Sequence, residues 1–179
     1  VRIPKEQYDI KHKNTAVADY LLRNFAKQLE RHSFQAHGSG KSGIIQVTRC
    51  GQEVLERTAC EIDEKTGDVT VRFEVGFPAR GRTIQAGELV KILYQYLPAC
   101  VEKALYYKNM DRNAVKQAAE LSVDQEYIRE QLKKEGLVAF IADGSILPRE
   151  SGDSQRPMKD ALPYASPDSK RITMKLPYK

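Results

Sequence analysis

The sequence is poor in the residues that build metal centres and disulfide frameworks. Its 179 residues include three cysteines, three histidines and no tryptophan. Cys50, Cys60 and Cys100 show no C-x-x-C spacing, so we expect neither a structural zinc site nor a disulfide framework. A reducing compartment suits this pattern, with each cysteine acting as a small buried hydrophobic residue.

Long apolar runs are absent as well. No uninterrupted apolar stretch approaches the ~18 residues that a membrane helix needs, and no signal-peptide pattern opens the chain. An apolar content of 41% and a charged content of 30% are typical of a globular protein. We therefore expect an intracellular protein of one domain, with no membrane partner. The start at Val1, without methionine, suggests a piece of a longer protein.

A complete P-loop is also lacking, although His37–Gly43 (HGSGKSG) resembles one. The Walker A pattern needs a glycine five residues before Gly40, where this chain has Gln35. A P-loop follows a strand and opens a helix, whereas here a helical pattern precedes the turn and a strand pattern follows it. We interpret the turn as a candidate phosphate contact rather than an ATP cradle, because successive N–H groups can bind an oxyanion. The residues of this contact are His37, Gly38, Ser39, Gly40, Lys41 and Ser42.

Positive charge is concentrated in the first part of the chain. Residues 1–49 hold nine basic and four acidic residues and so carry the whole net charge of +5. The remaining residues hold equal numbers of basic and acidic side chains. This one-sided excess favours a polyanionic partner, such as RNA or another nucleic acid.

Part of this charge lies on the first predicted helix, which we expect to begin with Asn14 or Thr15 as its N-cap. Arg23, Lys27 and Arg31 are four residues apart and form one basic ridge on that helix. The ridge is a candidate binding surface. A solvated helix face, partly neutralised by Glu30, is the alternative.

The remaining periodicities predict an α+β fold: a small, mainly antiparallel sheet with an N-terminal amphipathic helix and a helical middle segment. We expect an accessory domain over residues 1–142 and, over 143–179, a proline-rich connector with a returning strand. The predicted strands are 44–48, 54–62, 69–75, 137–141 and 171–176, with a hairpin loop at 63–68. The first predicted helix is 88–107, kinked or divided near Leu97 by Pro98. The second is 111–120, and the third starts at the capping box of Ser122 and stops at Gly136.

Two further clusters are candidate contacts. Arg80 and Arg82 flank Gly81 on a turn, where two guanidiniums can bind adjacent phosphates or carboxylates. A structural pair that holds Glu88 or a chain terminus is the alternative. In the connector, Arg149, Ser151 and Arg156 form another polar cluster and are candidates for contacts to a nucleotide. The alternative there is an ordered linker with capped turns.

No catalytic residues are predicted. His37 and lysine at position 41 exclude a G-x-S-x-G elbow around Ser39, and no metal site is predicted. The tyrosines of the helical middle do not form a stacking platform, so base-specific reading of a single strand is not expected.

Four blocks, read in order, resemble the predicted ABC-class ATPase family over essentially the whole chain: AHGSGKSG (36–43), GQEVLERT (51–58), FPARGRTI (77–84) and AFIADGSILPRESG (139–152). The opening IPKEQYDIKHKNTAVADYL fits the same family. The resemblance implies that the ATPase core, with its P-loop, signature and Walker B strand, lies downstream of this chain. It implies that this fragment holds no cofactor and that ATP and Mg²⁺ bind in that core.

The resemblance also implies partners. One relative belongs to a protist mitochondrial RNA-editing assembly, and the family is associated with RNA held along a positive opening in a homodimer. We therefore expect an accessory N-terminal domain that binds RNA or another polyanion and contacts its own ATPase core, in the mitochondrial matrix or the cytoplasm. Three alternatives stay open: a nucleotide-binding enzyme that uses the glycine turn, a structural or dimerisation module, and a domain whose connector contacts a neighbouring nucleotide.

Overall fold

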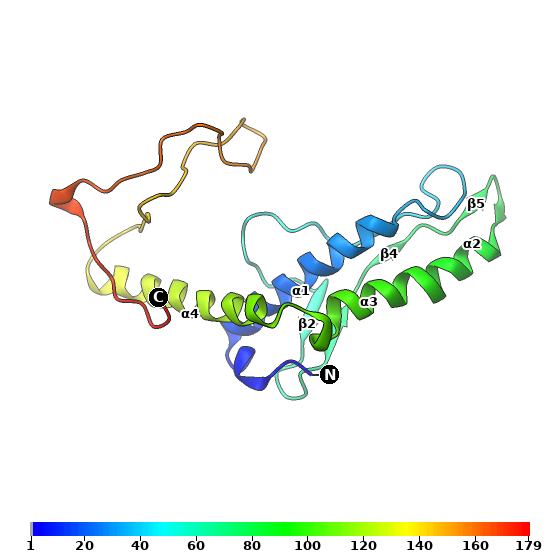
Figure 1. Ribbon diagram of the computed structural model, residues 1–179, viewed down its shortest axis with the longest axis horizontal. Coiled ribbons are helices and arrows are strands. Elements are labelled where there is room, and N and C mark those ends of the chain that lie inside the picture. The colour runs from blue at the N-terminus through cyan, green and yellow to red at the C-terminus, as the bar shows by residue number, and fades with distance from the viewer. Residues whose placement is uncertain (1) are drawn as a thin grey trace. The chain divides into compact units, whose positions relative to one another are not determined.

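Helix α1 (Lys11–His32) forms the centre of the core in the computed structural model, which describes residues 2–179 (Figure 1). Its buried positions recur every three or four residues, as at Leu21, Phe25 and Leu29, and they face α3 and the short strands β1 and β2. The helix begins at Lys11, so the predicted N-cap at Asn14 or Thr15 is wrong. The Asn14 amide instead donates to the carbonyl of Ile62, 2.9 Å away.

Six short strands form three antiparallel pairs, each with two strands. Strand β1 (Ile45–Gln46) pairs with β4 (Glu74–Val75), β2 (Cys60–Ile62) with β3 (Val69–Val71), and β5 (Ala79–Arg80) with β6 (Thr83–Ile84). The α+β class is confirmed, but the strands predicted over 54–62 and 69–75 are too long. Beyond Val71 the pairing continues in register by a single bond, from the N–H of Arg72 to the carbonyl of Ala59 at 2.9 Å, and the next strand begins only at Glu74.

The loop predicted between β2 and β3 is confirmed. The Asp63 carboxylate accepts the N–H groups of Thr66 (2.6 Å) and Lys65 (2.9 Å), and these bonds lower the pKa of Asp63. Gly67 has a φ of 72°, which a residue without Cβ adopts most readily. The hairpin therefore closes by local side-chain chemistry that the sequence shows directly.

The helical middle consists of α2 (Ala86–Lys91), a π-helical turn η2 (Ile92–Tyr96) and α3 (Leu97–Leu105). The helix is irregular at the predicted place, near Leu97, but it is not divided, because the three helical segments follow one another without a break. The N–H of Leu97 donates to the carbonyl of Ile92, five residues back, immediately before Pro98. Because Pro98 has no N–H and its ring crowds the preceding turn, the helix widens at this point instead of ending.

One helix, α4 (Arg112–Lys134), replaces the two predicted there. The Asp111 carboxylate caps its first turn by accepting the N–H groups of Asn113 (3.0 Å) and Ala114 (3.1 Å). The capping-box prediction at Ser122 is wrong, because Ser122 is buried within a continuous helix whose neighbours are good helix formers. The predicted stop is confirmed: Gly136 has a φ of 65°, and the next N–H reaches the carbonyl of Leu132.

The described chain divides into a first unit that ends at Glu120 and a second unit, Leu121–Lys179. Single-turn 3₁₀ helices complete the elements: η1 (Lys5–Gln7) and η3 (Tyr107–Asn109) in the first unit and η4 (Asp168–Lys170) in the second. The division of the chain into an accessory domain (1–142) and a connector (143–179) stays a prediction.

Neither strand predicted for the second unit forms in the described chain. Residues 137–141 and 171–176 have no strand partner, and Val138 is fully exposed. A strand requires a neighbour for its backbone groups, and apolar composition does not supply one. Side-chain bonds order this segment instead: Asp143 accepts the hydroxyl and the N–H of Ser166, both at 2.7 Å, which lowers the pKa of Asp143.

Candidate nucleic-acid interface

The glycine-rich loop 38–42 is bonded to the hairpin of β5 and β6. The Ser42 hydroxyl accepts the N–H of Ala79 at 3.0 Å and lies 2.6 Å from the carbonyl oxygen of Ser39. The N–H of Ser39 donates to the carbonyl of Ala79 at 2.8 Å. These bonds join two segments that are about forty residues apart in sequence, a contact that no local sequence pattern predicts.

Two glycines allow this close approach. A Cβ on Gly38 would lie 2.3 Å from the Cβ of Ser42, and one on Gly76 would lie 2.1 Å from the carbonyl oxygen of Lys41. Both distances are far inside van der Waals contact. The glycine content of this region is therefore explained by backbone packing, independently of any phosphate.

Within residues 37–43, four of the seven N–H groups already have acceptors, including that of Ser39 described above. Ser42 donates to the carbonyl of Ser39 (3.2 Å), Gly43 to that of Gly76 (2.8 Å), and His37 to the carboxylate of Glu88 (3.1 Å). Among residues 2–179, the N–H groups of Gly38, Gly40 and Lys41 have no partner. The loop lies between the end of α1 and the start of β1, so the predicted order, helix before and strand after, is confirmed. No helix N-terminus follows the loop to receive a phosphate.

The hairpin presents two exposed arginines. Gly81 and Arg82 form its two-residue turn, and the φ of 61° at Gly81 alone indicates a type II′ turn. Within the described chain, neither Arg80 nor Arg82 has a hydrogen-bond or ion-pair partner for its guanidinium. The alternative of a pair with Glu88 is wrong. Glu88 instead accepts from Lys91 at 2.6 Å, which with the N–H of His37 lowers its pKa.

The basic ridge of α1 divides into two parts. The Arg23 guanidinium pairs with Asp19 at 2.5 Å and donates to the carbonyl of Glu53 at 3.2 Å. The hydrogen bond to Asp19 raises the pKa of Arg23. In the described part of the chain, the Arg31 guanidinium donates only to the side-chain oxygen of Gln28, at 3.2 Å, and the ammonium of Lys27 has no partner.

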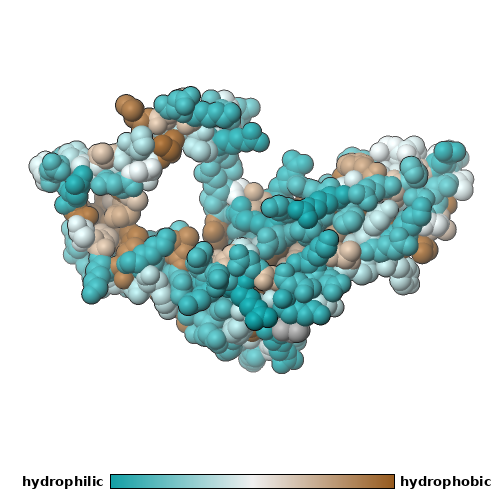
Figure 2. All heavy atoms as spheres, in the orientation of Figure 1, coloured by the Kyte–Doolittle hydropathy of each residue, from teal (hydrophilic) through white to brown (hydrophobic). Residues whose placement is uncertain are grey.

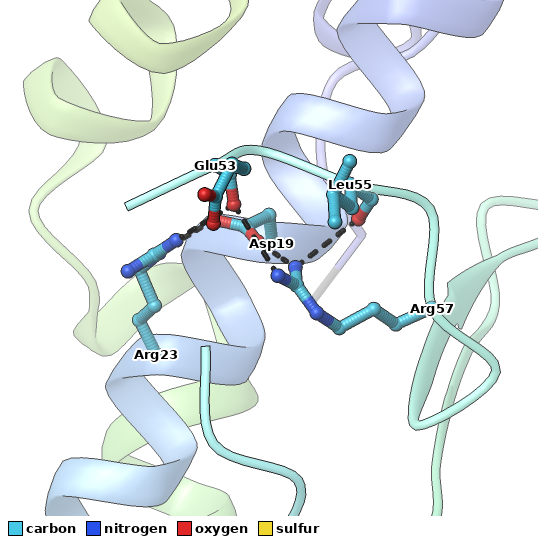
Figure 3. Close-up of polar contacts among 5 residues, drawn as sticks. All are labelled: Asp19, Arg23, Glu53, Leu55 and Arg57. Carbon is cyan, nitrogen blue, oxygen red and sulfur yellow. Dashed lines mark hydrogen bonds and ion pairs between the residues drawn. The ribbon is translucent and has the colours of Figure 1, made fainter. Parts of the chain in front are cut away.

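Asp19 is the centre of a buried ion cluster (Figure 3). Its side chain is 3% exposed and lies between two guanidiniums, Arg23 from α1 and Arg57 from the loop that precedes β2. Arg57 also donates to the carbonyls of Leu55 and Glu53, each at 3.3 Å. The cluster fixes this loop on α1. Sequence reasoning missed Asp19 and Arg57, although the i, i+4 spacing of Asp19 and Arg23 was a usable signal.

The end of α1, the glycine-rich loop and the hairpin of β5 and β6 lie together at one end of the first unit (Figure 1), and these three segments carry the predicted cations of the first unit that are outside this cluster. Hydrophilic side chains cover this end, with apolar atoms among them (Figure 2). We call this surface the basic tip; its residues are Lys27, Arg31, His37, Lys41, Arg80 and Arg82.

The connector cluster lies in the second unit. The N–H of Glu150 donates to the carbonyl of Arg156 (2.9 Å), and Arg149 forms a bridge with Pro157, so the two arginines share one small loop. Ser151 donates to Asp153 at 2.6 Å, which lowers the pKa of Asp153. The contact of Arg149, Ser151 and Arg156 with a nucleotide stays a prediction.

The described residues contain no group of three metal-ligating side chains and no helix that is both long and apolar enough to cross a membrane. The three cysteines are free thiols, and burial raises the pKa of Cys60 to about 12. The Ser42 hydroxyl bonds to backbone groups. These contacts give no sign of an activated nucleophile.

The first unit is thus a small α+β module that presents a cationic loop. Two family models match the chain: one described as the N-terminal part of an ATPase of the ABC class, over residues 1–108, and one described as a P-loop domain, over residues 111–179. The first covers more than half of the chain, which therefore belongs to the ABC-class ATPase family, a family of nucleotide-binding ATPases. No curated protein matches it.

The structure gives physical roles to three of the four blocks that carried the resemblance. Blocks 36–43 and 77–84 are the loop and the hairpin that Ser42 joins. Block 51–58 supplies Arg57 and the Glu53 carbonyl to the cluster around Asp19. The first unit therefore uses these blocks to build its tip and to fix the loop on α1.

Proposed function

We propose that the chain binds RNA or another polyanion through the basic tip, as the accessory N-terminal part of an ABC-class ATPase. The observation that carries the proposal is the convergence of unpaired cations on two bonded segments, Lys41 on the loop and Arg80 and Arg82 on the hairpin. Cations without internal partners are available to phosphates, and arginine can bind two phosphate oxygens at once.

The structure narrows the set of contacts. All residues of the basic tip are exposed, whereas the guanidinium of Arg23 is bonded to the carboxylate of Asp19 and the carbonyl of Glu53. The proposal therefore rests on the basic tip, with Arg23 as a support for the fold. Sequence preference is expected to be slight, because phosphate contacts carry no base information.

ATP hydrolysis, on this proposal, belongs to a core outside this chain, which would supply ATP and Mg²⁺ sites and a homodimeric arrangement. The loop lacks the first Walker A glycine at Gln35 and has no following helix. Residues 111–179, which match the P-loop domain model, contain no G-x-x-x-x-G-K-[ST] sequence. The isolated chain is therefore expected to bind Mg-ATP weakly and without dependence on Lys41.

The test is fluorescence anisotropy with a labelled RNA, repeated across a salt series. The variants are Lys41→Ala and Arg80→Ala with Arg82→Ala; Lys65→Ala is the matched control, because Lys65 is exposed on the β2–β3 loop near the N-terminal end of α1. Affinity should fall steeply as the salt concentration rises. The slope of log affinity against log salt concentration should shrink by about one for each phosphate contact removed. Equal affinities and equal slopes for all four proteins would refute the proposal, as would tight magnesium-dependent ATP binding that Lys41→Ala abolishes.

A further inference from the structure

Phe34 has a combination of properties that folding alone disfavours. Its φ is 63°, in the left-handed region that a bulky side chain rarely adopts, and 60% of the residue is exposed. It follows Ser33 at the end of α1, the position where glycine or asparagine usually ends a helix. Its N–H is fixed by the carbonyl of Gly43 at 2.8 Å. The backbone thus holds an aromatic ring in solvent at a position where a smaller residue would be less strained.

Phe34 also lines a groove between the C-terminal part of α1 and β1. The groove encloses about 530 Å³. Its apolar wall comes from Leu29, Ile44 and Val47, and its charged groups are Glu30 and Arg49. Within residues 2–179 the Arg49 guanidinium has no hydrogen-bond or ion-pair partner. The groove therefore combines an exposed aromatic ring, an apolar wall and a free cation, and its residue Phe34 is bonded to Gly43, which directly follows the loop of the basic tip.

This combination suits a nucleobase attached to a phosphate. A base has a flat face that stacks on an aromatic ring, and its phosphates require cations such as Arg49 and the basic tip. In a duplex the base faces are covered by their neighbours, so only an unpaired base can enter. An apolar peptide would contact the Phe34 ring and the apolar wall, but it would gain nothing from the unpaired guanidinium of Arg49.

We propose that Phe34 is a base-stacking residue and that the groove takes one unpaired base of a single-stranded nucleic acid whose phosphates lie on the basic tip. The inference rests on the proposed function and adds the strandedness of the ligand. It also adds a single aromatic contact at a place where the tyrosine pattern predicted no stacking platform. A stacked base typically changes affinity roughly five- to 100-fold.

The test compares a labelled 12-nucleotide RNA with the same RNA annealed to its complement, by fluorescence anisotropy on the full chain. The variant is Phe34→Asn, because asparagine tolerates the left-handed backbone and removes the ring. Phe34→Tyr keeps the ring. The control is Tyr94→Ala, which removes a 76% exposed aromatic residue outside the groove. A second probe, 2-aminopurine in the single strand, reports stacking by fluorescence quenching.

The wild type should prefer the single strand roughly fivefold or more, and Phe34→Asn should lose that preference and the quenching while keeping its salt slope. Phe34→Tyr and Tyr94→Ala should behave like the wild type, and Glu30→Gln should bind more tightly because a carboxylate no longer opposes the phosphates. The inference is overturned if the wild type binds the single-stranded and the annealed RNA equally and Phe34→Asn does not change either affinity. The proposed function still stands in that case if the tip variants weaken the binding of both RNAs. Absence of all nucleic-acid binding would overturn both. A thermal melt of Phe34→Asn, expected to match or exceed the wild type, separates lost stacking from lost folding.

Discussion

The hydroxyl oxygen of Ser42 lies 3.0 Å from the backbone nitrogen of Ala79, and this part-buried hydrogen bond is one of those that join the glycine-rich loop to the arginine hairpin. Ser42→Ala removes the acceptor and leaves a partly buried N–H without a partner. We expect a loss of about 2 kcal/mol in the free energy of unfolding and weaker RNA binding, because Lys41 and Arg80 are no longer held together. Urea denaturation measures the first effect and anisotropy the second. Ser39→Ala is the control, because its hydroxyl donates to the Ala79 carbonyl at 3.1 Å in an exposed bond that water can replace. If both variants unfold at the same urea concentration, Ser42 has no special role.

Gly76 and Gly87 form a matched pair for testing the backbone packing. A Cβ at Gly76 would lie 2.1 Å from the Lys41 carbonyl oxygen, whereas one at Gly87 meets nothing within 4 Å. Gly76→Ala should therefore destabilise the protein by about 2 kcal/mol or more through displaced backbone. Gly87→Ala, in helix α2, should stabilise it by about 0.5 kcal/mol. Thermal unfolding distinguishes the two, and similar shifts for both would contradict the close packing of residues 41 and 76.

Asp19→Asn tests the ion cluster. The substitution leaves the guanidiniums of Arg23 and Arg57 without their shared carboxylate, and Arg57 is largely buried. We expect a loss of about 3 kcal/mol in the free energy of unfolding, because an unpaired buried charge is costly. Asp68→Asn is the control, since the Asp68 carboxylate has no partner among the described residues. A loss below about 1 kcal/mol for Asp19→Asn would show that the cluster behaves like a surface pair.

The Cys60 thiol gives a prediction for alkaline pH. Burial raises its pKa from 9.0 to about 12, so the folded protein keeps the neutral thiol while the unfolded chain ionises first. The contribution of this thiol to stability is present below pH 9 and is lost as the pH rises from about 9 towards 12. Native Cys60 should react with iodoacetamide far more slowly at pH 8 than in the urea-unfolded chain. Equal rates, followed by mass spectrometry, would show that the thiol is accessible.

Local chemistry made some elements readable from the sequence. The loop at Asp63, the helix stop at Gly136 and the irregular turn before Pro98 each depend on residues that lie within a few positions of one another. Other predictions failed where a contact between distant segments, or the lack of one, determined the local structure. Asn14 bonds to Ile62 instead of capping a helix, and residues 137–141 have no strand partner in the described chain.

The candidate site divides in the same way. The sequence by itself determined the α+β class, the charge excess of residues 1–49, the failure of HGSGKSG as a P-loop, and the family. Each of these depends on residue types and their order along the chain. Only the tertiary structure decided which cations are free: it placed Arg57 beside Asp19, bonded Glu88 to the N–H of His37, and left Arg80 and Arg82 exposed. Partners of a charged side chain are set by folded distances of a few ångströms, and sequence spacing does not encode those distances between segments forty residues apart.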